Sequence, residues 1–338
     1  MAGIGTAHLR DDDDRVLVRV ENLVVEFPAK GGQKVQAVSD ISFDILDGET
    51  LGVVGESGCG KSTTGRAMLQ LPPPTSGSVR LDDVELTALS GDDLRKIRPK
   101  LQMIFQDPIS SLNERRTVYD VVSEGLKIWD WPSADIPRRV SELLEAVGLD
   151  PQAVKDRYPR SFSGGQCQRI CIARALVLDP KVVICDEPVS ALDVSVQAQI
   201  LNLLRDMRER YGVTLVFITH DLGVVKNISD RIIVMYLGRI CEVATPDDLF
   251  ATPAHPYTRL LMESVPRIET DGPDEERQAL PPAELPSPMN PPSGCRFRTR
   301  CEFKQEICET TIPELVEVTP GHFTACHFPV LDDPIPLR

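Results

Sequence analysis

The sequence lacks the features of a membrane-spanning, secreted or nucleic-acid-binding protein. It has no window of about 20 uninterrupted apolar residues, the length that a membrane helix requires. Residues 1–20 contain no apolar signal core and include four consecutive aspartates. With 37 basic against 51 acidic residues, the net charge is −14, which argues against a binder of phosphate backbones. We therefore expect a cytosolic chain, one that is still able to dock on a membrane protein.

The length and composition allow one large domain with an appendage, or two modest domains. The chain has 338 residues, of which 41% are apolar, enough for a hydrophobic core. Shifts in composition predict a flexible, solvated arm (1–15), a main domain (16–250) with a helical part (about 107–175), an extension with a proline-dense linker (251–294), and a cysteine-rich tail (295–338).

Hydrophobic periodicity predicts an α/β fold for the main domain. The stretches "VLVRVENLVVEF" and "VQAVSDISFDI" alternate apolar and polar residues, which is typical of antiparallel strands. Residues 107–175 instead have apolar residues at helical spacing. Two β-branched runs, "KVVICDEP" and "TLVFITHD", flank the helix-like "VSVQAQILNLLRDMRERYG". Strand, long helix and strand in this order indicate a βαβ unit of a parallel sheet.

The strongest motif is "GESGCGKS", from Gly55 to Ser62, which matches the pattern G-x-x-x-x-G-K-[ST] between an apolar strand and a helix. Glycines let successive backbone N–H groups surround a phosphate, and the helix N-terminus adds partial positive charge. Lys61 is placed to reach the β- and γ-phosphates, and Ser62 to offer its hydroxyl to Mg²⁺. A chance glycine turn is the alternative, and this context disfavours it. We expect a nucleotide site.

Two further motifs extend this hypothesis. In "VVICDEP", Asp186 ends an apolar strand, where a carboxylate can hold Mg²⁺, and Glu187 follows as the candidate general base. A pair of solvated loop acids is the alternative. In "SFSGGQCQRICIARAL", a serine and two glycines precede a helix and form a second possible anion cradle. One nucleotide needs only one such anion-binding turn, so the second turn suggests contact with a nucleotide that is bound by another subunit.

The motifs "GESGCGKST", "SGGQCQR", "CDEPVSALD" and "ITHD", in this order, resemble the ATP-binding subunit of an ABC transporter over about residues 16–250. The resemblance implies an ABC-type P-loop ATPase fold with an antiparallel β subdomain and a helical subdomain, and it implies ATP and Mg²⁺ as ligands. The positions that it matches to ATP contact are Phe27, Gly55, Glu56, Ser57, Gly58, Cys59, Gly60, Lys61, Ser62 and Thr63.

The resemblance also implies roles for residues outside the phosphate loop. Gln106 matches the glutamine that touches Mg²⁺ and the attacking water, and His220 the histidine that contacts the γ-phosphate. Asp193 matches an aspartate at a dimer seam. The residues matched to the signature turn that faces the partner's ATP are Ser163, Gly164, Gly165 and Gln166. The alternatives are a loop amide for Gln106, a strand-end histidine for His220, a helix N-cap for Asp193 and a core residue for Phe27.

Beyond the ATPase body, "HPYTRLLMESVP" and "LPSPMNPPSGCRFRTRC" resemble the C-terminal extension of the oligopeptide/dipeptide permease branch, F type. The resemblance implies peptide import, with related nickel or sugar importers, or a soluble non-transport ABC ATPase, as alternatives. It implies a D-type ATP-binding partner, two transmembrane permease subunits and an extracytoplasmic solute-binding protein. It places the chain peripherally on the cytoplasmic face of the cell membrane. For His255 in this segment, a turn or packing role is favoured over metal ligation.

The tail holds Cys295, Cys301, Cys308 and Cys326, spaced C-x5-C-x6-C-x17-C. No tight pair typical of structural zinc occurs, and a reducing compartment disfavours disulfides. Wide spacing suits a [4Fe–4S] cluster, and the resemblance extends such a cluster to these residues. Zinc and free thiols stay open, and we expect a structural rather than a redox role. We interpret the remaining cysteines as small buried or incidental residues: Cys59, Cys167, Cys171, Cys185 and Cys241.

Overall fold

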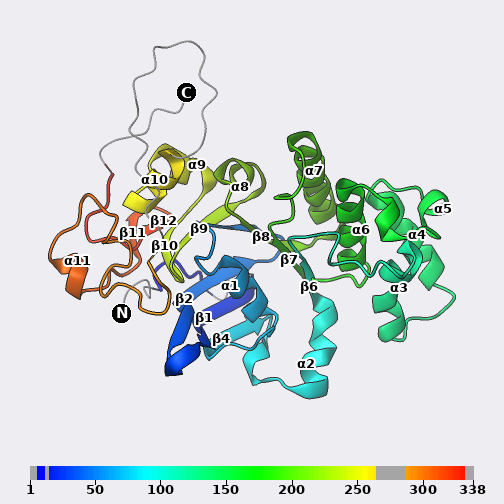
Figure 1. Ribbon diagram of the computed structural model, residues 1–338, viewed down its shortest axis with the longest axis horizontal. Helices are drawn as coiled ribbons and strands as arrows, with labels where there is room; N and C mark the ends of the chain where they lie inside the picture. Colours follow the sequence, from blue (N-terminus) through cyan, green and yellow to red (C-terminus); the bar gives the residue numbers. More distant parts are fainter. Residues whose placement is uncertain (1–5, 12–14, 264–285, 332–338) are drawn as a thin grey trace, which may run out of the picture. The chain divides into compact units, whose positions relative to one another are not determined.

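The computed structural model describes residues 6–11, 15–263 and 286–331 (Figure 1). Most of the linker predicted within 251–294 therefore lies outside the described residues, as does part of the N-terminal arm. The chain forms two compact units. The first comprises Met1–Asp44, Val53–Thr87 and His220–Arg338, and the second comprises Ile45–Gly52 and Ala88–Thr219.

The first unit contains an antiparallel sheet in the order β2-β1-β4-β5. Its strands are β1 (Val16–Pro28), β2 (Lys34–Leu46), β4 (Ser76–Leu81) and β5 (Val84–Glu85). Strand β1 pairs antiparallel with β4, with buried Val18 and Val20 opposite Leu81 and Val79. Burial does not alternate strictly, because Leu17 and Arg19 of β1 are buried as well. The antiparallel β subdomain predicted from the period of two is thus confirmed.

A second group of strands in the first unit has the order β11-β12-β10-β9. Its members are β9 (Arg231–Tyr236), β10 (Arg239–Ala244), β11 (Val316–Thr319) and β12 (His322–Thr324). The β9–β10 hairpin turns at Leu237 and Gly238, both at positive φ, as a tight hairpin turn requires. The tail strand β12 pairs antiparallel with β10, with Glu242 opposite Thr324, so the tail extends this sheet (Figure 1).

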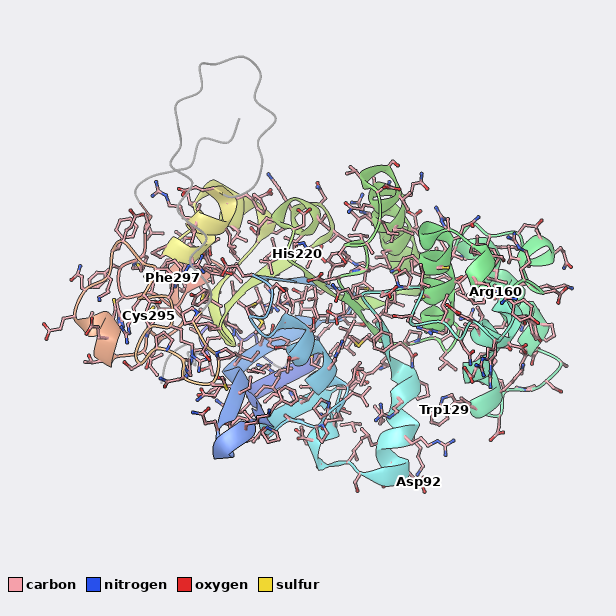
Figure 2. The ribbon with its side chains drawn as sticks, viewed as in Figure 1. Asp92, Trp129, Arg160, His220, Cys295 and Phe297 are labelled. Atoms are coloured by element: carbon pink, nitrogen blue, oxygen red, sulfur yellow. The ribbon has the colours of Figure 1, made fainter. Side chains whose placement is uncertain are left out.

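The cysteine-rich tail also shares the hydrophobic core of the first unit. The core cluster includes Tyr236 of β9 and Tyr257, and the tail contributes Phe297, which packs against both rings. Figure 2 labels Phe297 next to Cys295. The helices of this unit are α1 (Lys61–Met68), α8 (Leu222–Ile228), α9 (Pro246–Ala251), α10 (Pro256–Glu263) and α11 (Ile307–Thr310).

The second unit contains the expected βαβ arrangement. Strands β6 (Leu101–Ile104), β7 (Val182–Asp186) and β8 (Thr214–Thr219) are parallel, and α7 (Val194–Tyr211) connects β7 to β8. Its remaining helices are α2 (Gly91–Ile97), α3 (Val118–Ile128), α4 (Ile136–Ala146), α5 (Pro151–Val154) and α6 (Gly164–Leu176). Helix α3 packs against α4 and α6. Residues 118–176 are mainly helical, close to the predicted helical part.

Several short elements complete the chain. Strand β3 (Thr50–Val54) crosses the boundary, with its first three residues in the second unit and its last two in the first. Short 3₁₀ turns occur at Lys30–Gly32, Leu86–Ala88, Arg98–Lys100 and Pro159–Ser161. Within the described part of the chain, no helix combines the length and the apolarity needed to cross a membrane.

The described part of the N-terminal arm is anchored on the first unit. The buried His8 ring Nε2 hydrogen-bonds to the Ser42 carbonyl at 2.6 Å, and the Arg10 backbone N–H donates to the Asp44 carboxylate at 2.5 Å. Asp44 itself is fully buried on β2 and pairs with Arg231 at 2.7 Å. Burial raises the pKa of Asp44, but the Arg231 and Arg10 charges and hydrogen bonds outweigh it, and the pKa is lowered.

We predict that Arg231→Met lowers the free energy of unfolding by about 3 kcal/mol near pH 7, because it leaves a buried carboxylate without its main cation. A lowered folded pKa stabilises the protein above the unfolded value of about 3.9, and this contribution disappears as pH falls through the folded pKa. The deficit should therefore shrink below about pH 4. Urea unfolding at pH 7 and at acid pH measures it.

Lys96→Met is the matched control, because Lys96 pairs with Asp93 on an exposed face of α2. Exposed pairs contribute little, so this change should stay within about 0.5 kcal/mol. Equal deficits for the two variants would contradict the role assigned to Arg231.

Candidate functional site

The phosphate loop, residues 55–63, joins β3 to α1 in the first unit and depends on glycine at its contacts with neighbouring backbone. Gly55 and Gly60 have φ of 152° and 106°. A Cβ on Gly55 would lie 2.2 Å from the Met235 carbonyl oxygen, and one on Gly60 would lie 2.3 Å from the Ala37 carbonyl oxygen. Any larger residue would push the loop away from β9 or from β2.

The Lys61 ammonium lies inside this loop. Its side chain donates to the carbonyl oxygens of Gly55 and Glu56, at 2.7 and 3.0 Å, and the residue is only 3% exposed. These acceptors are neutral, so the positive charge is left to attract an anion. Ser57 and Gly58 are exposed and mark the open side of the loop. Residues 61–63 form the first turn of α1, where N–H groups are available to an anion.

The sequence interpretation of Cys59 as a small buried residue is confirmed. Its thiol is 1% exposed, and burial raises its pKa. The other four cysteines outside the tail are buried as well, and none of the nine cysteines forms a disulfide.

The phosphate loop is held from outside by residues that the motif search missed. The Glu56 carboxylate accepts two hydrogen bonds from the Arg300 guanidinium, at 2.7 and 2.9 Å. The Glu56 backbone N–H donates to the Tyr257 hydroxyl at 2.8 Å, and the Cys59 carbonyl accepts from Gly238 N–H at 2.7 Å. In the sequence, the basic run "CRFRTRC" is conspicuous in an otherwise acidic protein, but it does not indicate which acidic residue an arginine would pair with.

Two other predicted residues lie on the first unit. Phe27, near the end of β1, is 37% exposed, so the alternative of a buried core phenylalanine is wrong. His220, which directly follows β8, is exposed (Figure 2). Both side chains are therefore available for contact with a ligand.

In the second unit, the structure brings Gln106 and Glu187 together from positions 81 residues apart. The Gln106 side-chain amide donates to the Glu187 carboxylate at 3.1 Å. Glu187 has a φ of 47°, a left-handed conformation that is uncommon for glutamate and concentrates at functional sites. Its neighbour Asp186 ends β7 and is 1% exposed, so a carboxylate is buried at the end of a parallel strand. Such a group favours a nearby cation.

The signature turn begins helix α6. The Ser163 hydroxyl accepts a hydrogen bond from the Gln166 backbone N–H, and the Gln166 side-chain oxygen accepts one from the Ser163 backbone N–H, which together form a capping box. Both residues are exposed, whereas a Cβ on Gly165 would lie 2.6 Å from Val196 of α7. Asp193 occupies the N-cap position of α7, but its exposed side chain accepts no capping hydrogen bond in the described structure.

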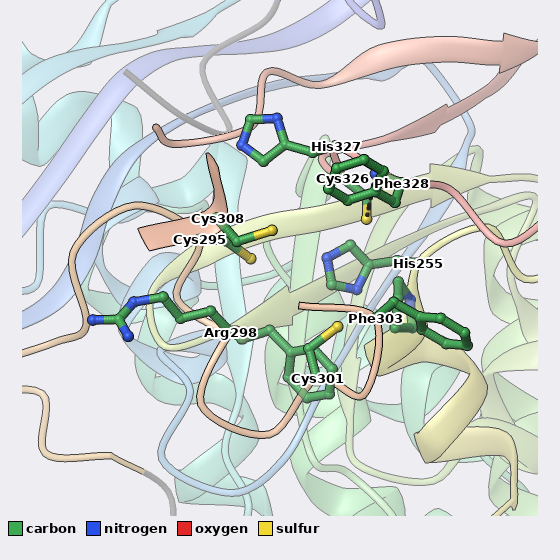
Figure 3. A pocket seen from close by; sticks show the side chains of 11 residues that line it. His255, Cys295, Arg298, Cys301, Phe303, Cys308, Cys326, His327 and Phe328 are labelled. Carbon is green, nitrogen blue, oxygen red and sulfur yellow. Dashed lines mark hydrogen bonds between the residues drawn. The ribbon is translucent and has the colours of Figure 1, made fainter. Parts of the chain in front are cut away.

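The four tail thiols line one cavity (Figure 3). Cys295 N–H donates to the Cys308 carbonyl at 2.9 Å, which joins two of the cysteine loops. Burial, with some repulsion from neighbouring thiols, raises the pKa of Cys295 to about 11 and of Cys326 to about 12. Among the described residues, no three histidine, cysteine or acidic side chains converge closely enough to hold a single metal ion.

His255 borders the same cavity, and its environment agrees with the packing role. Its Nδ1 accepts from the Tyr257 backbone N–H at 3.0 Å, and its ring packs against Phe297. Burial lowers the pKa of His255 to about 4, so the ring is neutral at pH 7.

Comparison with known proteins agrees with this geometry. A family model described as "ABC transporter" matches residues 38–190, and one described as "Oligopeptide/dipeptide transporter, C-terminal region" matches residues 241–308. The oligopeptide transport ATP-binding protein OppF of Salmonella typhimurium is 47% identical, over 92% of this chain and 96% of its own. AppF of Bacillus subtilis is 45% identical, over 93% and 98%. This chain belongs to the oligopeptide/dipeptide family of ABC transporter ATP-binding proteins.

Solved structures support the same fold. CbiO1 from Clostridium perfringens, part of an ABC transporter complex, is 31% identical with a TM-score of 0.63, over 70% of this chain and 91% of its own. MJ0796, a bacterial ABC transporter cassette solved as a dimer, is 30% identical with a TM-score of 0.62, over 68% and 98%. The chain is thus an ABC transporter ATPase of α/β fold.

We predict that Gly60→Ala weakens ATP binding on the order of 100-fold, because the new Cβ would meet the Ala37 carbonyl and displace the loop. Gly58→Ala is the matched control: Gly58 also has positive φ, but a Cβ there meets nothing within 4 Å. Its loss should stay below about tenfold. Titration with a fluorescent ATP analogue measures both, and equal losses would contradict the steric account.

Proposed function

We propose that this chain is the ATP-binding and ATP-hydrolysing subunit that energises import of oligopeptides or dipeptides. The observation that carries the proposal is the complete, braced phosphate loop in a chain that matches its relatives from the ATPase body through the C-terminal extension. Two of these relatives, OppF and AppF, are described as oligopeptide transport ATP-binding proteins. A related nickel or sugar importer would use the same ATPase chemistry.

Binding of ATP is assigned to the phosphate loop. Its N–H groups and the start of α1 surround the β-phosphate, Lys61 neutralises the β- and γ-phosphates, and Phe27 stacks on the adenine. Ser62, Asp186 and Gln106 provide the oxygen donors that suit Mg²⁺, which neutralises charge on the triphosphate when bound.

Hydrolysis is assigned to residues that follow the strand ends. Glu187 is the proposed general base and accepts a proton from the water that attacks the γ-phosphate. Its hydrogen bond from Gln106 supports this assignment, because the amide orients the carboxylate. His220 contacts the γ-phosphate. Positioning and charge neutralisation supply most of the catalysis in phosphoryl transfer.

Turnover requires a second ATP-binding subunit. The turn at Ser163, Gly164, Gly165 and Gln166, whose first and last residues are exposed, offers N–H groups at a helix N-terminus to the partner's ATP, and Asp193 lies at the seam. The proposed partners are a D-type ATP-binding subunit, two transmembrane permease subunits and an extracytoplasmic solute-binding protein. The chain then acts peripherally at the cytoplasmic face of the membrane.

We predict that Glu187→Gln retains ATP but hydrolyses it at least about 100-fold more slowly, the usual contribution of a general base. The assembled transporter in liposomes is assayed for phosphate release and for retained nucleotide. Glu145→Gln, an exposed change on α4, is the control and should hydrolyse ATP normally. Normal hydrolysis by Glu187→Gln would remove it from the role of base.

The tail thiols are the proposed ligands of a [4Fe–4S] cluster: Cys295, Cys301, Cys308 and Cys326. Support comes from the shared cavity, since soft thiolates suit iron–sulfur clusters or zinc. A single zinc ion needs all four sulfurs at about 2.3 Å from one point, whereas a cube takes one thiolate at each iron. Zinc, which also takes thiolate ligands, is the alternative occupant. When bound, the cluster supplies bonds that tie the tail loops together.

We predict that chain purified without oxygen contains iron and acid-labile sulfide, and that Cys326→Ser loses most of both. Elemental analysis and visible absorbance measure this loss. Cys167→Ser, at a buried thiol of α6, is the control and should keep its metal. Stoichiometric zinc without sulfide, or metal content unaffected by Cys326→Ser, would overturn the cluster assignment.

A further inference from the structure

The cysteine-rich tail contacts the phosphate loop directly. Arg300 spans 244 positions of sequence to form its bidentate pair with Glu56, the second residue of the loop motif. The pair is mostly shielded from solvent, with side-chain exposures of 13% and 28%. Planar, two-bond pairs of this kind fix orientation as well as charge, which a single surface ion pair does not.

The Arg300 guanidinium is itself fixed by aromatic rings of the core. It lies 5.8 Å from the Tyr236 ring centroid and 5.9 Å from that of Phe297. Tyr257 packs on both of these rings, and its hydroxyl accepts a hydrogen bond from the Glu56 backbone N–H. Glu56 is therefore held at its side chain and at its backbone by one aromatic cluster to which the tail contributes.

A second tail arginine braces the other end of the loop. Arg296, four residues before Arg300, donates to the Leu237 carbonyl, and to Ser39 at 2.9 Å. Gly238, which follows Leu237 in the β9–β10 turn, donates its N–H to the Cys59 carbonyl of the loop. The tail thus supports the phosphate loop at Glu56 directly and at Cys59 through the β9–β10 turn.

The charge of Glu56 gives this contact a function. An ionised carboxylate within a loop that receives a triphosphate repels the phosphates, and the repulsion is strong where water is partly excluded. Arg300 cancels this charge and turns the carboxylate outward onto the tail. The hydrogen bonds to Glu56 raise the pKa of Arg300, so the guanidinium remains charged throughout the accessible pH range.

We propose that Arg300 is a positioning residue of the nucleotide site: it neutralises and orients Glu56, so that the C-terminal tail sets the affinity of the phosphate loop for ATP. The inference rests on the proposed binding of ATP at this loop. Arg296 follows Cys295, and Arg300 precedes Cys301, so each of the two arginines is adjacent in sequence to a cysteine that lines the cavity.

The test is a double-mutant cycle on the full chain, with a fluorescent ATP analogue as the probe. Arg300→Ala should weaken binding about tenfold, within the usual range for coupling between sites. Glu56→Gln removes the repelling charge, and its measured affinity is the reference for the double variant. In the double variant, Glu56→Gln should restore most of the affinity lost in Arg300→Ala, which demonstrates that Arg300 acts through Glu56.

Two further variants separate positioning from general stability. Arg300→Lys keeps the charge but not the bidentate geometry, and should recover part of the lost affinity. Arg298→Ala is the matched control: Arg298 borders the same cavity, but its guanidinium donates within the tail to Ser293 (Figure 3). Its affinity should equal that of the wild type, and thermal unfolding of every variant reports whether it is folded.

Each outcome has a distinct meaning. If the wild type fails to bind the analogue, the proposed function is wrong. If the wild type binds but Arg300→Ala binds equally well, or if its loss is unchanged by Glu56→Gln, the positioning role is wrong while the proposed function stands. Equal losses for Arg298→Ala and Arg300→Ala would assign the effect to general damage in the tail and would also overturn the inference.

Discussion

The architecture depends on the contacts that neighbouring strands make with the phosphate loop, because these contacts fix the loop's conformation. A loop whose N–H groups point inward has few hydrogen bonds within itself, so its shape must be imposed by neighbouring backbone. Gly55 meets the Met235 carbonyl and Gly60 meets the Ala37 carbonyl at distances that exclude a side chain. The strands β2 and β9 are therefore walls for this loop, and their positions in the first unit fix where a phosphate is received.

Electrostatics adds a second requirement. The chain has a net charge of −14, yet its nucleotide site must accept a polyanion. The structure meets this need locally: Lys61 is buried among neutral carbonyls, and the loop's own acid, Glu56, is paired with Arg300. Overall charge thus excludes a general phosphate binder, whereas a few placed cations still create a site for one ligand.

Local patterns in the sequence predicted the elements whose interactions are local. Alternation identified β1 and β2, and the phosphate-loop motif placed the turn before α1 correctly. Long-range pairings left no such pattern. Strand β12 has three residues, too short for periodicity, and its pairing with β10 requires knowledge of the fold. The Arg300–Glu56 pair and the left-handed backbone of Glu187 are likewise set by tertiary contacts that no local propensity describes.

The tail has two distinct means of support. A segment with little apolar content cannot form its own core, and this one adds Phe297 to the core of the first unit. Buried Glu242 accepts hydrogen bonds from His322 of β12 and from the backbone N–H groups of Ala254 and His255, which fixes the end of the tail. These contacts dock the tail without using a thiol. The cysteine cavity lies among the loops between residues 295 and 308, the part of the tail that carries Arg300 to its pairing with Glu56.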